Sequence, residues 1–191
     1  MEGKAVSTDV LDEFARTQWE TILYFMVGSE HTSVPRNTVL FLLQRAGLMQ
    51  RDNSSSKKLN ITSKGFQFLL QDVNSQLWAL LLQYLSMAEE RNMDLVEVLA
   101  FFFTVGGLEL GRAYETRGFS TTQLQTLEEL SDYGLVYRPN KSAKHFFPTR
   151  LAATLTSTAS PLLLTLNDQE EQGYLILETN YRVYALSLIH I

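Results

Sequence analysis

The sequence predicts an α+β fold that is predominantly helical, built from two tandem winged-helix-like units with a C-terminal β-hairpin. Three observations support this fold class. Apolar residues recur at the three-and-four spacing of amphipathic helices, short apolar runs beside polar loops follow these helices, and part of the sequence repeats at a fixed offset. With 191 residues, 45% of them hydrophobic, the chain is long enough for two small domains in contact.

The first unit begins with a helix predicted over residues 9–27, with Thr8 or Asp9 as its N-cap. A second helix is expected to open near Ser33, with Pro35 in its first turn. Two short strands around a polar loop and a third helix follow. This order of elements is typical of a winged-helix unit.

A long amphipathic helix is predicted over residues 72–91, between the two units. The second unit then opens with a helix over residues 94–105. The segment from Ser120 to Gln123 has the sequence of a capping box and predicts the start of another helix. Two strands on either side of a second polar wing complete this unit.

An internal repeat relates the two units. Displacing the sequence by 87 residues aligns Leu43, Gly47, Leu48 and Thr62 with Leu130, Gly134, Leu135 and Thr149. The spacing between flanking glycines is shorter in the first copy, which leaves little room there for a middle helix. The first copy is therefore expected to be degenerate.

These elements predict six segments. They are a first unit over 9–71, a connecting helix over 72–92, a second unit over 93–156, a linker loop over 157–172, a β-hairpin over 173–186 and a tail over 187–191. The turn of the hairpin is expected at Thr179 and Asn180.

Composition argues against several classes of function. The chain has no cysteine, three histidines far apart in sequence and a formal net charge of -5, so it offers no thiolate site and repels phosphate backbones overall. Its most apolar run, residues 98–105, is far shorter than the roughly 20 residues of a membrane span. No nucleophile, phosphate loop or metal motif is recognisable, so we expect neither an enzyme nor a cofactor.

Basic residues in the two wings are the candidates for contact with nucleic acid or an acidic partner. Loop lysines also keep a hairpin soluble, so the other interpretation is that these residues only solubilise the wings. The candidates are Lys57, Lys58, Arg138, Lys141, Lys144 and Arg150.

Three consecutive aromatic residues, Phe101, Phe102 and Phe103, lie on a helix that is apolar nearly all round. Burial in the core is one interpretation, because a helix of this kind packs on several sides. A partner-binding face is the other.

Several strings, in order along the chain, resemble the fifty-two-kilodalton subunit of the transcription and DNA-repair factor TFIIH. The resemblance runs from about Val10 to Ala185. It is carried by strings such as Phe25-Met26-Val27-Gly28-Ser29, Met93-Asp94-Leu95-Val96-Glu97, Pro148-Thr149-Arg150-Leu151-Ala152 and Glu178-Thr179-Asn180-Tyr181-Arg182.

The resemblance implies a nuclear, non-catalytic subunit of core TFIIH, acting in RNA polymerase II initiation and nucleotide-excision repair. Such a subunit anchors the XPB-type DNA translocase, stimulates its ATPase and uses winged-helix modules for protein contacts. The other TFIIH core subunits are then its partners. A winged-helix module that binds nucleic acid through basic wings is the alternative.

The resemblance also implies that the chain is a middle fragment of such a subunit. Family members continue beyond the hairpin into the module that binds the eight-kilodalton subunit, so that binding does not carry over. The last residues, 186–191, do not match the polar helix start expected there.

Overall fold

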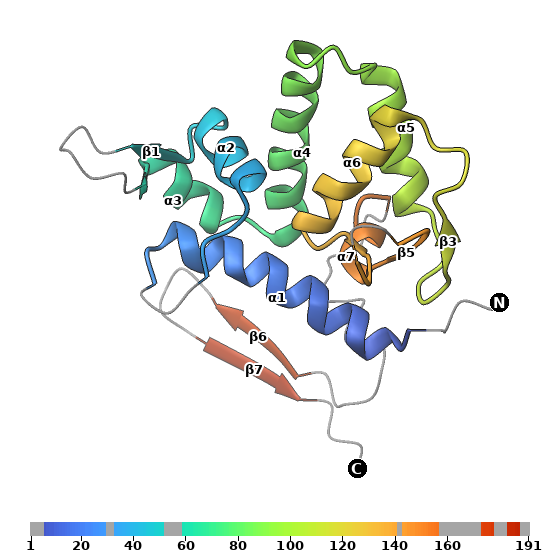
Figure 1. Cartoon of the computed structure of the whole chain (residues 1–191). Helices are drawn as coiled ribbons and strands as arrows, with labels where there is room; N and C mark the ends of the chain where they lie inside the picture. Colours follow the sequence, from blue (N-terminus) through green and yellow to red (C-terminus); the bar gives the residue numbers. More distant parts are fainter. Residues whose placement is uncertain are drawn as a thin grey trace.

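The computed structural model describes residues 6–29, 33–51, 59–140 and 143–156, and the backbone of 173–177 and 183–187 (Figure 1). The protein is mainly helical α+β with small antiparallel sheets. The helices are α1 (Thr8–Met26), α2 (Asn37–Arg45), α3 (Ser63–Leu69), α4 (Val73–Glu90), α5 (Leu95–Gly106), α6 (Thr121–Asp132) and α7 (Arg150–Ala153). The strands are β1 (Met49–Arg51), β2 (Leu59–Ile61), β3 (Tyr114–Glu115), β4 (Val136–Tyr137), β5 (His145–Pro148), β6 (Gly173–Leu177) and β7 (Val183–Ser187).

Two predicted helix starts are wrong. The N-cap of α1 is Ser7, whose hydroxyl oxygen accepts from the Val10 amide, and not Thr8 or Asp9. Helix α2 begins only after Arg36, which is extended at ψ 154°, so Pro35 lies before the helix. The reason is that a residue that precedes proline is forced out of the helical region, which prevents a start at Ser33.

The predicted repeat is present in the hydrogen bonds that one threonine of each copy donates to the backbone. In the first copy the Thr62 hydroxyl donates to the carbonyl of Gly47 at 2.7 Å, and the Thr62 amide donates to Leu48 at 3.0 Å. In the second copy the Thr149 hydroxyl donates to the carbonyl of Gly134 at 2.7 Å, and its amide donates to Leu135 at 2.9 Å. The repeat is therefore structural as well as sequential.

Strand register follows the same offset. In the first hairpin Met49 pairs with Ile61, and in the second Val136 pairs with Pro148. The second copy adds β3, which pairs with the other edge of β5 and gives the order β3-β5-β4. Strand β3 was not predicted, because a strand of two residues shows no alternation of polar and apolar positions.

The C-terminal strands β6 and β7 form the predicted antiparallel hairpin, in which Leu177 pairs with Val183. The turn predicted at Thr179 and Asn180, the linker 157–172 and the last residues lie outside the described part of the chain.

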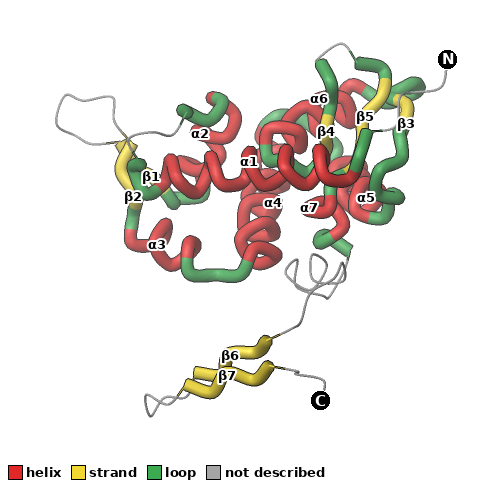
Figure 2. Tube along the Cα trace, turned by 90° about the horizontal axis from the view of Figure 1, so that it is seen from below, coloured by secondary structure: helices red, strands yellow, loops and turns green. Residues whose placement is uncertain are grey.

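Helix α1 joins the two copies, and Figure 2 shows it lying across both. Although it precedes the first copy, it packs on α7 and β4 of the second. The ring of Phe14 meets Tyr137 edge-on at 5.1 Å between centroids. A Cβ on Gly134 would lie 2.9 Å from the carbonyl oxygen of Ala15. Helix and hairpin are therefore in close contact.

The buried apolar residues of both copies form one connected core. Tyr84, Phe102 and Leu81 are among its most deeply buried side chains. None of the described helices is long and apolar enough to cross a membrane.

Candidate protein-interaction face

Helices α4 and α5 pack against each other and are joined by a short turn, so they run antiparallel. Each helix begins at an aspartate. The Asp72 carboxylate accepts from the Ser75 amide and hydroxyl, and the Asp94 carboxylate accepts from the amides of Val96 and Glu97. The hydrogen bonds from the Ser75 side chain and backbone lower the pKa of Asp72. Both caps place negative charge at a helix N-terminus, where it is favourable.

The solvent side of this helix pair carries large apolar side chains. The rings of Trp78 and Phe103 meet at 6.0 Å between centroids, although Phe103 is 47% exposed. One turn further along each helix, in antiparallel order, are Leu82 and Leu99. Leu82 is 60% exposed, and Val96, one turn before Leu99, is 75% exposed.

This side of the two helices has no formal charge. We call it the α4–α5 face and define it by the positions that share one side of each helix. They are Ser75, Trp78, Ala79, Leu82 and Ser86 of α4, and Val96, Leu99, Ala100, Phe103 and Thr104 of α5. Contiguous exposed apolar surface of this kind typically marks a site of protein interaction.

Charged and hydroxyl groups behind the face fix α4 against α6. The Arg91 guanidinium donates to both oxygens of Glu129 at 3.0 and 3.1 Å, and the Tyr84 hydroxyl lies 3.4 Å from that of Thr126. Burial raises the pKa of Tyr84 and the pKa of Tyr133 well above the ordinary value of a phenol. Both phenols therefore stay neutral at physiological pH and act as structural groups.

Replacing Arg91 by leucine is expected to lower the free energy of unfolding by about 2 kcal/mol, because it leaves the nearly buried Glu129 carboxylate without its cation. The double variant Arg91→Leu/Glu129→Leu is expected to recover most of that loss. Urea denaturation of the two variants and the parent chain measures both values. A double variant less stable than the single one would contradict this account of the pair.

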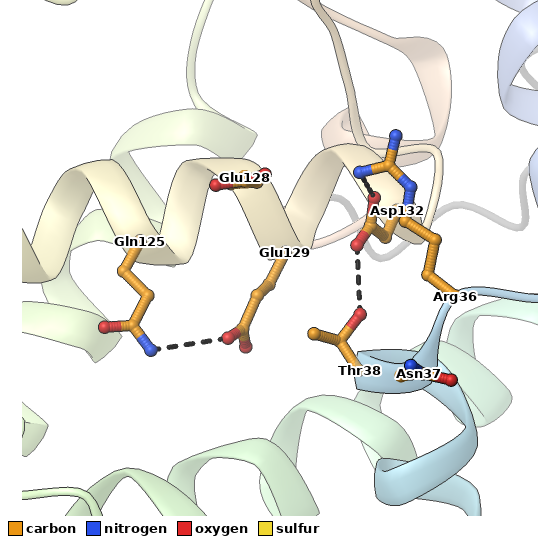
Figure 3. Close-up of a pocket in the computed structure, with 7 residues that line it drawn as sticks. All are labelled: Arg36, Asn37, Thr38, Gln125, Glu128, Glu129 and Asp132. Carbon is orange, nitrogen blue, oxygen red and sulfur yellow. Dashed lines mark hydrogen bonds and ion pairs between the residues drawn. The ribbon is translucent and has the colours of Figure 1, made fainter. Parts of the chain in front are cut away.

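A polar cleft of about 520 Å³ lies where α2 meets α6, and Figure 3 shows its lining. Arg36 forms an ion pair with Asp132 at 2.6 Å, and the Thr38 hydroxyl donates to the same carboxylate at 3.0 Å. The Gln125 amide donates to Glu129 at 3.5 Å. The two contacts to Asp132 hold the first copy to the second, whereas the one between Gln125 and Glu129 lies within α6. No group of three or more side chains that could hold a metal ion occurs among the described residues.

The basic residues predicted to contact nucleic acid or an acidic partner differ in their exposure and in their ion pairs. Arg150 forms an ion pair with Asp12 at 3.1 Å, so its charge is used within the chain. Arg138 is half-buried at the end of β4, and Lys144 is exposed before β5. Lys57, Lys58 and Lys141 lie outside the described residues.

Of the three consecutive phenylalanines at 101–103, two are core residues and one is at the surface. Phe101 is 4% exposed and Phe102 is fully buried, so both belong to the core. Only Phe103 reaches the surface, where it contributes to the α4–α5 face. Trp78, Leu82 and Val96 were not among the residues predicted from the sequence to form a protein interface. The available signal was the absence of charge along one side of each predicted helix.

The geometry describes a mainly helical α+β repeat protein that presents an uncharged apolar face. The sequence profile of the transcription factor Tfb2 family matches residues 1–188, and the chain belongs to this family.

Curated relatives agree with that assignment. The chain is 47% identical to the general transcription and DNA repair factor IIH subunit TFB2 of Yarrowia lipolytica over 94% of its length. It is 50% identical to the subunit of that name from Saccharomyces cerevisiae over 82% of its length. It is 38% identical to general transcription factor IIH subunit 4 of Dictyostelium discoideum over 95% of its length. The chain spans 41%, 30% and 39% of these relatives, respectively.

Proposed function

We propose that this chain is a non-catalytic, architectural part of a nuclear TFIIH subunit, which anchors the XPB-type DNA translocase and stimulates its ATPase during transcription initiation and nucleotide-excision repair. Family membership supports the assignment to TFIIH, since the relatives are named as subunits of that factor. The α4–α5 face is the observation that carries the binding role. Its three most exposed large side chains, Leu82, Val96 and Phe103, are 60%, 75% and 47% exposed.

The repeated helix, hairpin and helix of each copy act, in this proposal, as two winged-helix-like units over 9–71 and 93–156, joined by the connecting helix 72–92. Their wings are not used to bind nucleic acid. The ion pair of Arg150 with Asp12 supports this, because it removes one of the predicted cations from any phosphate contact. The net charge of -5 also argues against nucleic-acid binding, because the chain as a whole repels phosphate groups.

The test is a pull-down of separate TFIIH core subunits by this chain at low and at high salt, with duplex DNA as a control ligand. We expect capture of the translocase that survives high salt, because apolar contacts are screened little. Retention of DNA at low salt, with no subunit captured, would instead support the nucleic-acid-binding alternative.

Phe103→Asp is expected to weaken capture of the translocase by at least tenfold, because a central aromatic anchor of an interface typically contributes about 2 kcal/mol or more. Phe41→Asp is the matched control, since Phe41 lies on α2 and is 48% exposed against 47% for Phe103. Titration of the translocase against each variant measures the affinities. Equal weakening by the two variants would rule out the α4–α5 face as the binding surface.

A further inference from the structure

A groove of about 690 Å³ runs along helix α1 and shares no residue with the α4–α5 face. Its floor is apolar. Ala15, Trp19 and Leu23 follow one another at intervals of four residues on α1, and Val73 of α4 and Leu151 of α7 complete the floor. The stripe on α1 is about 12 Å long, since a helix rises 1.5 Å per residue. That length corresponds to two turns of a helix lying alongside it.

The rim of the groove is acidic. It contains four carboxylates and two guanidinium groups. Both guanidinium groups are paired with rim carboxylates, Arg16 with Glu13 and Arg150 with Asp12. The remaining carboxylates, Asp9 and Glu20, are therefore the source of the net negative charge. They form no ion pair with a described residue and lie about 16 Å apart along α1.

The floor also contains an unmatched hydrogen-bond donor. Trp19 is only 5% exposed, and its indole N–H has no acceptor among the described residues. Buried tryptophan rings usually find a partner for this group. An apolar floor and two carboxylates without an ion pair among the described residues together describe a site whose occupant is not among these residues.

We infer that the groove binds a basic amphipathic helix of a partner protein. Its apolar residues, spaced three and four apart, cover Ala15, Trp19 and Leu23. Lysine or arginine side chains about three turns apart pair with Asp9 and Glu20. A volume of about 690 Å³ suits two or three large aliphatic side chains. Complementary charge, rather than apolar area, then selects this partner from other amphipathic helices.

The test measures binding in the groove through the fluorescence emission of Trp19. The chain contains two tryptophans, so a Trp78→Phe background leaves Trp19 alone. A synthetic amphipathic helix with a leucine stripe and two flanking lysines is added to the whole chain, and tryptophan emission is recorded. We expect a saturable change in emission, and about tenfold weaker binding of the same peptide to Asp9→Asn/Glu20→Gln, most visible at low salt. Glu89→Gln, an exposed carboxylate at the far end of α4, is the matched control and is expected to bind as the parent does.

A charge exchange separates binding in the groove from loss of folding. The variant Asp9→Lys/Glu20→Lys is expected to reject the lysine-flanked peptide and to accept the same peptide with glutamates in place of the lysines. Absence of a saturable change with the parent chain overturns the inference. So does equal binding of a peptide with the same composition in scrambled order, or of the lysine-flanked peptide to the charge-exchanged variant.

Discussion

Replacing Phe102 by aspartate is expected to lower the free energy of unfolding by about 5 kcal/mol or more, which is on the order of the whole stability of a small domain. Phe102 is fully buried, and its ring lies 5.7 Å from that of Tyr84, so the substitution removes a core contact between α5 and α4. The carboxylate would also lie in apolar surroundings without a cation, or would have to be protonated there. Urea denaturation followed by circular dichroism measures the loss.

The neighbouring substitution Phe103→Asp is the control for this prediction. It has the same chemistry one residue along the helix, but Phe103 is 47% exposed. Loss of its ring contact with Trp78 is expected to cost only about 1 kcal/mol. Comparable losses in the two variants would contradict the placement of one ring in the core and the other at the surface.

The pair of variants also separates stability from binding. Phe102→Asp is expected to abolish capture of a partner because the chain unfolds. Phe103→Asp is expected to weaken capture of the translocase while the chain stays folded. Only the second result is informative about the α4–α5 face.

Local features of the fold could be predicted from the sequence because their causes are local. The spacing of apolar residues predicted α4 and α5 to within a residue or two. The capping box from Ser120 to Gln123 is present at the start of α6. The repeat was visible because a glycine at positive φ and a threonine hydroxyl perform the same task in both copies.

Features that depend on contacts distant in sequence could not be predicted. The ion pair of Asp12 with Arg150 joins residues at opposite ends of the described helical part, and no local pattern indicates it. The same applies to the packing of α1 on the second hairpin. The α4–α5 face is an intermediate case. Its uncharged positions are visible on each helix alone, but only the packing of the two helices joins them into one surface.

The second large effect is expected from Gly65→Ala. Gly65 lies within α3, where an alanine would ordinarily stabilise the helix by about 1 kcal/mol. Here the added Cβ would lie 2.3 Å from the carbonyl oxygen of Leu48 and 2.6 Å from Cγ1 of Ile61. Because the nearest atom belongs to the backbone, α3 must move away from β1 and β2. We expect a net loss of about 3 kcal/mol in the free energy of unfolding.

Gly107→Ala is the control for this substitution. Gly107 has an ordinary φ of -90°, and the nearest atom to an added Cβ is the Phe103 carbonyl oxygen at 3.4 Å. The free energy of unfolding of this variant, measured by urea denaturation, is expected to stay within about 0.5 kcal/mol of the parent value. The second copy has an alanine, Ala152, at the position equivalent to Gly65, so the close approach is particular to the first copy.

The manner in which the Gly65→Ala variant unfolds tests whether the two copies form one cooperative structure. Their buried residues form a single core, and α1 contacts both. A strained first copy should therefore lower the denaturation midpoint of the whole chain, with the same midpoint for Trp19 and Trp78 when each is the only tryptophan. Two separate midpoints would mean that the copies unfold independently. In that case the contacts between α2 and α6 contribute too little to couple them.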